Sequence, residues 1–267
     1  MFAALPFTLA LITSPQSGWE TKSNTTKIPF EVHNAVVKAL QEATEAQTKR
    51  DYQLSLALLH GIIYNDGVKI AVDPDGLTPT PAARQGLTNA LNSWDKALEK
   101  DNPIQFVSDP KKAHLTLQFV DKVPRSGHDA LGLIELKKRY SWNRSRYEIE
   151  ISGTIFIQTH YNRIPLSASQ FTEVIAHELG HLLGLDDLNQ TGQLMGPMIL
   201  DQPVSGPNAR ETYAVQIVRY HAKTQWNTVV DLINASKQSQ PEAEFLSYEQ
   251  EYLATCTVGR PCKYGKH

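Results

Sequence analysis

The stretch HELGHLLGLDD, residues 177–187, constrains the fold of this 267-residue chain more than any other feature. On an α-helix, His177 and His181 are four residues apart, so their imidazoles project from one face about one turn apart. Neutral imidazole nitrogens are preferred ligands of zinc. The pattern therefore predicts a helix that presents two zinc ligands, and the rest of the fold has to supply the remainder of the site.

A catalytic zinc ion needs a third protein ligand and an open fourth position. A straight helix does not supply the third ligand, because its next turn carries Leu185 away from the metal. Gly184 lacks a Cβ and tolerates positive φ, so it can end the helix and turn the chain back. Asp187 then follows with a carboxylate oxygen. We expect His177, His181 and Asp187 to bind one catalytic Zn²⁺ ion.

Glu178 lies one residue after the first histidine, beside the ligand face and too close in sequence to coordinate comfortably. Its carboxylate can reach a water at the metal and take a proton as that water attacks a carbonyl carbon. A carboxylate third ligand lowers the formal charge of the centre relative to three histidines. We therefore expect a less acidic water and a larger contribution from Glu178 as the general base.

This arrangement resembles the extended signature of the metzincin zinc peptidases, HExxHxxGxxH or HExxHxxGxxD followed by a methionine turn beneath the metal. Met195, in the run LMGP, stands where that turn falls. The spacing from the first histidine to Met195 is similar to the matrixins, whereas Asp187 is similar to the third ligand of snapalysin-type metzincins. The resemblance implies an α+β fold with a twisted mixed sheet, an active-site helix and a C-terminal helix. It also implies a zinc-dependent endopeptidase that cleaves proteins or peptides.

The resemblance covers roughly residues 68–220. It implies that the strand near residues 153–157 is an edge strand that binds an extended substrate through backbone hydrogen bonds. We therefore expect Ile155 and Ile157 to bind substrate, and Pro197 and Ile199 to line the pocket that follows the scissile bond. In matrixins a propeptide cysteine silences the zinc, but here no cysteine precedes the motif.

Around this site we divide the chain into four segments. Residues 1–17 are a candidate signal peptide, 18–66 a helical propeptide or accessory segment, 67–222 the peptidase domain, and 223–267 a helical extension. Apolar periodicity predicts helices at 29–59, 81–100, 208–220, 225–233 and 242–253. It predicts strands from 68, at 104–107, 113–121, 131–136 and 147–159, with a basic connection at 137–146 and a bulge or bend at Gly153. Ser167 and Gln170 form a capping box before the motif.

The formal net charge of −2 offers no electrostatic case for a nucleic-acid partner. Residues 1–13 are apolar and uncharged, too short to span a membrane but suited to a secretory signal, the alternative being an unstructured apolar terminus. We therefore expect a secreted or extracytoplasmic monomer without stable membrane insertion. In that setting Cys256 and Cys262 would form a short-loop disulfide, whereas in the cytosol they would be two thiols.

Three other interpretations stay open at this point. A zinc-bearing binding domain whose termini cover the cleft would not be catalytic, but Glu178 argues against it because a structural zinc site needs no base. A zinc amidase acting on a smaller substrate would use the same geometry. Finally, HExxH alone is a weak motif, so a chain that binds no metal is the third alternative.

Overall fold

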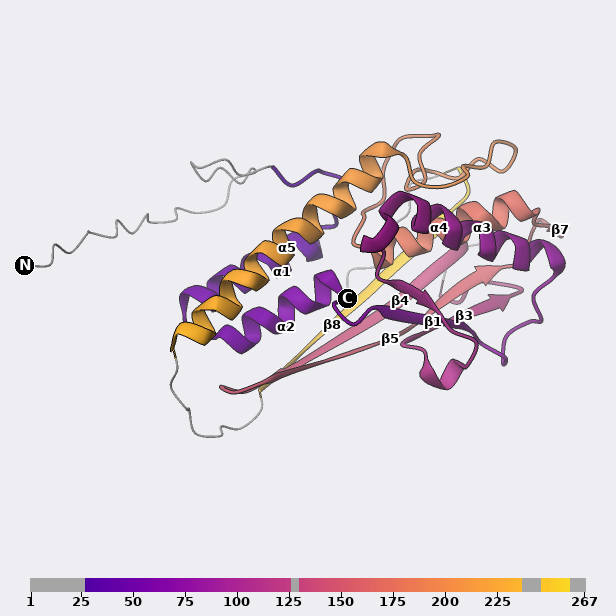
Figure 1. The fold of residues 1–267 in the computed structure, drawn as a ribbon. Coiled ribbons are helices and arrows are strands. Elements are labelled where there is room, and N and C mark those ends of the chain that lie inside the picture. Colours follow the sequence, from indigo (N-terminus) through magenta and orange to yellow (C-terminus); the bar gives the residue numbers. More distant parts are fainter. Residues whose placement is uncertain (1–26, 126–129, 237–245, 260–267) are drawn as a thin grey trace, which may run out of the picture.

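The computed structural model describes residues 27–125, 130–236 and 246–259. The expected signal peptide and Cys262 lie outside the described residues. Figure 1 shows a twisted sheet with the helices gathered on one face, so the predicted α+β class is confirmed. No helix in the described part of the chain has the length and apolar character needed to cross a membrane.

The sheet has six strands among the described residues, in the order β2-β1-β3-β5-β4-β8. Their bounds are β1 Val68–Val72, β2 Ile104–Phe106, β3 Leu115–Val120, β4 Ala130–Trp142, β5 Tyr147–Gln158 and β8 Leu246–Thr257. The four strands β2, β1, β3 and β5 run parallel to one another, whereas β4 is antiparallel to both β5 and β8. A separate hairpin joins β6 (His160–Tyr161) to β7 (Ile164–Pro165).

Helices α3 (Pro81–Leu98) and α4 (Ala168–Leu182) pack against each other over one end of this sheet. Thr80 caps α3 and Pro81 occupies its first turn, where a missing backbone N–H costs nothing. At the crossing, the indole Nε1 of Trp94 donates to the carbonyl of Ala176 at 2.9 Å, and Trp94 is fully buried. These contacts hold α4 in a fixed position against the sheet.

Helices α1 (Asn34–Thr48), α2 (Tyr52–Ile63) and α5 (Ala209–Ser236) lie together over the other end, where β4 and β5 extend beyond β3. The Lys138 ammonium donates to the carbonyl of Gly61 at 2.7 Å, and the Tyr64 hydroxyl donates to the carbonyl of Leu182 at 3.0 Å. Leu40 and Leu59 belong to the same apolar cluster as the α3 and α4 residues. The N-terminal helices are therefore a layer of the main core.

Several predicted elements differ from the structure. The chain between residues 29 and 59 forms two helices instead of one, because Arg50 at positive φ breaks the run after α1. The two helices predicted at 208–220 and 225–233 are one helix, α5 (Ala209–Ser236), so the boundary expected at residue 222 falls inside a helix. The basic connection at 137–146 is mostly the continuation of β4. Gly153 pairs in regular register and is no bulge; a Cβ there would lie 2.1 Å from the Glu135 carbonyl oxygen.

The largest correction concerns the C-terminal segment. The helix predicted at 242–253 is wrong, because residues 246–257 form strand β8, which is hydrogen-bonded along β4. In its second half the even-numbered residues face the core, where Ala254 and Cys256 are buried, whereas the odd-numbered Glu249 and Glu251 are exposed. A strand at the edge of a sheet forms backbone hydrogen bonds with its neighbouring strand. These hydrogen bonds and the buried face of β8 outweigh the helical preference of its glutamates.

Candidate metal centre

Helix α4 begins at the predicted capping box and passes through the core to the site. The Ser167 hydroxyl accepts from the Gln170 backbone N–H, and the Gln170 side chain accepts from the Ser167 backbone N–H. Every residue of α4 from Phe171 to Leu182 is buried. The two histidines and Glu178 therefore belong to a helix that is packed on all sides and held in a fixed position.

The helix ends where Gly184 adopts φ 94°, a left-handed conformation that strains residues with a Cβ. The Gly184 N–H donates to the His181 carbonyl, and the Leu185 N–H donates to the Gly180 carbonyl. The turn is then tied to the N-terminal segment, because the His33 N–H donates to the Gly184 carbonyl at 2.9 Å. This turn carries Asp187 back towards the imidazoles.

Three donor atoms converge at this point. The Nε2 atoms of His177 and His181 lie 3.0 Å apart, and Asp187 Oδ1 lies 3.2 Å and 3.4 Å from them. Tetrahedral zinc with ligand distances of about 2.0–2.1 Å separates its nitrogen and oxygen ligands by about 3.3 Å. The three side chains are nearly inaccessible to solvent, at 5% exposure or less. Two imidazoles and a carboxylate in this geometry fit a zinc ion.

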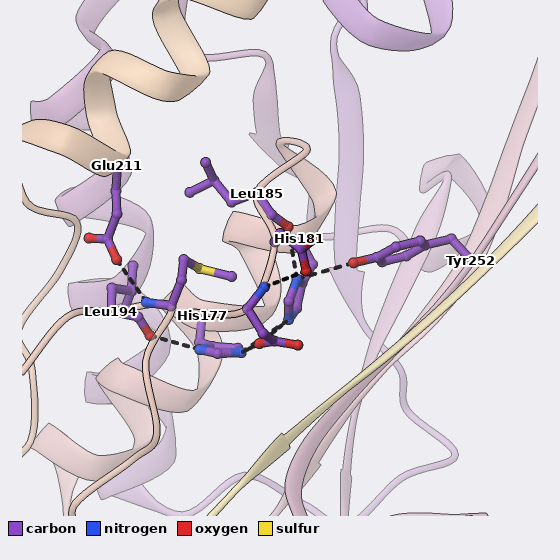
Figure 2. Close-up of polar contacts among 9 residues, drawn as sticks. His177, His181, Leu185, Leu194, Glu211 and Tyr252 are labelled. Atoms are coloured by element: carbon purple, nitrogen blue, oxygen red, sulfur yellow. Dashed lines mark hydrogen bonds and ion pairs between the residues drawn. The ribbon is translucent and has the colours of Figure 1, made fainter. Parts of the chain in front are cut away.

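Backbone carbonyls determine which imidazole nitrogens face the site. The Nδ1 atom of His177 lies 2.7 Å from the Leu194 carbonyl oxygen, and Nδ1 of His181 lies 3.1 Å from the Leu185 carbonyl oxygen (Figure 2). A carbonyl only accepts, so each Nδ1 carries a proton and donates. The lone pairs of both Nε2 atoms are therefore directed at the convergence point, as metal-binding histidines require.

The pKa values of His181 and Asp187 depend on each other, because the two side chains are adjacent. Burial alone would lower the pKa of His181, but the adjacent Asp187 carboxylate outweighs it and raises the pKa above its ordinary value. Burial alone would raise the pKa of Asp187, but the two imidazoles outweigh it and hold the pKa well below its usual range. A metal ion bound by these side chains would take the place of protons on the imidazoles, so metal binding would release protons.

Met195 lies under α4, next to the histidines. It is fully buried, and a Cβ on Gly180 would come within 2.4 Å of its sulfur, so the glycine permits the contact. The Met195 carbonyl accepts from the Leu188 N–H at 2.7 Å, and the Met195 N–H donates to Glu211 Oε1 at 2.8 Å. The loop after α4 is therefore attached to both the ligand turn and the start of α5.

Glu178 is fully buried between α4 and β4. A Cβ on Gly132 would lie 2.3 Å from Glu178 Oε1, so only glycine at this position of β4 leaves room for the carboxylate. The carboxylate also belongs to a second group of candidate metal-binding atoms, together with His177 and Cys256. The structure thus brings together all four residues predicted for the metal and the base.

The predicted substrate residues are placed differently. The expectation that residues 153–157 form an edge strand is wrong, because β5 lies between β3 and β4 and both of its edges are hydrogen-bonded. Ile155 and Ile157 are fully buried and do not present side chains to a substrate. Pro197 is buried and Ile199 half-buried in the loop after Met195, and their role in the pocket stays a prediction.

Three residues at the site did not follow from the sequence reasoning. Glu211 accepts hydrogen bonds from the backbone N–H groups of Met195 and Asn208, and the spacing of Asn208 and Glu211 is itself a capping signal. Tyr252 places its hydroxyl 3.2 Å from Nδ1 of His181 (Figure 2), and Cys256 is buried beside His177. The period-two pattern of residues 246–256 was the signal for the last two.

Comparison with known families agrees with this geometry. The matrixin family model matches residues 68–218, which is more than half of the chain. The match begins at β1 and ends within α5, so α1, α2 and β8 lie outside it. Among curated proteins, no sequence matches the chain.

Proposed function

The chain belongs to the matrixin family of zinc metallopeptidases, and from this premise we propose that it is an endopeptidase that hydrolyses peptide bonds in proteins. The convergence of His177, His181 and Asp187 within 3.0–3.4 Å is the observation that carries the proposal. Such a donor set would hold zinc, which supplies a Lewis acid for the scissile carbonyl and lowers the pKa of a water. Asp187 as the third ligand is part of the proposal.

Glu178 acts in this proposal as the general base. Its carboxylate lies beside His177 in a site without solvent access, where a fixed base is more effective than a solvated one. It takes a proton from the attacking water and returns that proton to the leaving amine. Gly132 has no side chain, so the carboxylate packs directly against the backbone of β4.

In this proposal β4, and not β5, is the strand along which an extended peptide substrate aligns. Of the strands beside the site, β4 is the one that passes Glu178, and β5 covers its other edge. An extended peptide adding to β4 would form backbone hydrogen bonds past the metal centre. In this structure β8 occupies that edge, so peptide binding requires β8 to leave.

A non-catalytic zinc-bearing domain is compatible with β8 on this edge, and it is therefore one outcome of the test below. A zinc amidase for smaller substrates has no comparable support in the fold. We further propose that residues 1–17 direct export from the cytoplasm and that the protein is a monomer. Its substrates would be proteins or peptides.

The test combines metal analysis with a general peptidase assay. We expect about one zinc per chain and cleavage of casein or a peptide library that is lost in Glu178→Ala. Because β8 covers the edge, each assay is run in the native chain and in a Cys256→Ser background. A zinc-loaded protein without Glu178-dependent cleavage in either background would reject the endopeptidase and leave the binding domain.

A further inference from the structure

Strand β8 covers the whole of β4. The pairing runs from Ala130 opposite Thr257 to Trp142 opposite Leu246, with a single shift in register between Ala130 and Gly132. Without β8, β4 would be the open edge of the sheet beside the metal centre, with unpaired N–H and C=O groups that bind extended chains. The chain itself therefore takes the place that an extended peptide would occupy.

The last residues of β8 are held from both sides. Opposite β4, Val258 forms a parallel bridge with Met198, and the Gly259 N–H donates to the Met198 carbonyl at 3.0 Å. The segment thus lies between β4 and the 197–199 loop, which is the loop predicted to line the substrate pocket. Tyr252 adds an anchor beside the metal ligands, because its ring packs edge-on against His33 at 4.7 Å and its hydroxyl lies against His181.

Cys256 lies near the C-terminal end of this covered stretch. It pairs with Gly132, whose lack of a side chain leaves space for the Glu178 carboxylate on the same face of the sheet. Its side chain is buried, and its Sγ, a ring nitrogen of His177 and a carboxylate oxygen of Glu178 all lie within 4.8 Å of one another. In a tetrahedral zinc site, sulfur and nitrogen ligands at about 2.3 Å and 2.0–2.1 Å lie about 3.6 Å apart. Sγ belongs to the group with His177 and Glu178 and not to the group with His181 and Asp187, so coordination requires the thiol to move towards the three ligands.

We propose that β8 is an inhibitory strand of this chain and that the Cys256 thiolate is the fourth ligand of the metal, which closes the centre until β8 is released. The proposal rests on the proposed peptidase function for its regulatory meaning, but the ligand assignment does not need it. On binding, the thiol proton leaves to solvent and the sulfur lone pair fills the position that a catalytic centre keeps open. Glu178 then has no water to deprotonate.

Ion pairs between β4 and β8 hold the strand in register but are weak enough for it to be released. Lys137 on β4 pairs with Glu249 and Glu251 on β8 at 2.6 Å and 3.6 Å, and Arg139 pairs with Glu249 at 3.2 Å. These ion pairs are partly or largely exposed and contribute little to stability, although they define the register of the strand. The thiolate and Tyr252 are then the specific contacts at the site itself.

The test uses the Cys262→Ser variant of the full chain, in which Cys256 is the sole cysteine. Loaded with Co²⁺ in place of Zn²⁺, it should show a sulfur-to-cobalt charge-transfer absorption that disappears in Cys256→Ser. Zinc should also slow alkylation of Cys256 in the Cys262→Ser variant by about tenfold or more, because a bound thiolate is not available as a nucleophile. The absorption and alkylation readouts need only the native Cys256 and are independent of peptidase activity.

The outcomes separate the two proposals. Sulfur absorption together with Glu178-dependent cleavage that rises about tenfold or more in Cys256→Ser supports both, since a closed zinc site lacks the open position for catalysis. Sulfur absorption without cleavage in any variant supports the ligand and rejects the peptidase. Absence of the absorption, with zinc-independent alkylation and equal cleavage by the Cys256→Ser and Cys262→Ser variants, overturns the inhibitory strand and leaves the peptidase standing.

Discussion

Replacing Gly184 with alanine tests whether the turn after α4 places the third ligand. Gly184 has φ 94°, and an added Cβ would lie 3.0 Å from Cγ2 of Val36 on α1. A left-handed conformation costs a residue with a Cβ about 1–2 kcal/mol. With the tight contact, we expect a loss of about 1–3 kcal/mol in the free energy of unfolding. In a domain of this size that corresponds to a melting temperature lower by roughly 2–10 °C.

The matched control is Gly192→Ala. Gly192 has φ 76° in the loop after Asp187, but nothing lies within 4 Å of its Cβ position. Both variants should lose the backbone contribution. The Gly184 variant should in addition lower zinc affinity about 10–100-fold, because a shifted turn no longer directs Asp187 at the histidines.

The assay is chelator competition for zinc, with thermal unfolding measured in the presence and absence of the metal. Each tenfold loss in affinity removes about 1.4 kcal/mol of zinc-dependent stabilisation at fixed free zinc. The Gly184→Ala melting curve should therefore respond less to zinc than the Gly192→Ala curve. Equal zinc affinity in the two variants would refute the idea that this turn places the ligand.

Three further perturbations follow from the structure. Burial raises the pKa of Glu173 to about 7, so the folded protein loses stability as pH rises from the pKa of this carboxyl in the unfolded chain through 7. Glu173→Gln should therefore stabilise the metal-free protein at pH 8 by up to about 3 kcal/mol, measured by thermal unfolding, and should change its stability little at pH 4. Equal effects at the two pH values would contradict this. Glu211→Gln loses one of two acceptors for the Met195 and Asn208 N–H groups and should destabilise the protein by about 1–3 kcal/mol in denaturant titration, whereas an unchanged midpoint would deny that bracing role. Lys137→Glu places like charges beside Glu249 and should speed alkylation of Cys256 by about two- to fivefold, and the Glu249→Lys partner change should restore the slow rate; if the double variant stays fast, the ion pair does not hold β8.

The parts of the site that the sequence predicts are the local ones. His177, Glu178 and His181 follow from helical geometry, because residues four apart share a face in any helix. Gly184 and the capping box at Ser167 follow from backbone preferences that act within a few residues. Asp187 approaches the histidines because the turn is short, so its arrival needed no information from distant segments.

The parts that the sequence did not predict depend on which distant segments pair. Residues 246–257 carry an alternation that suits a strand and glutamates that suit a helix, and only the open edge of β4 decides between them. The same pairing moves the peptide-binding edge from β5 to β4 and brings Cys256 more than seventy residues along the chain to His177.

The sequence by itself determined a helix with two zinc-type ligands, a base beside them and a turn that returns a carboxylate. Only the tertiary structure decided that β8 lies across this site and that Tyr252 and Cys256 reach it. The reason is physical: contacts within a helix and its turn are set by the spacing of a few residues, whereas sheet neighbours are chosen by the whole set of competing edges.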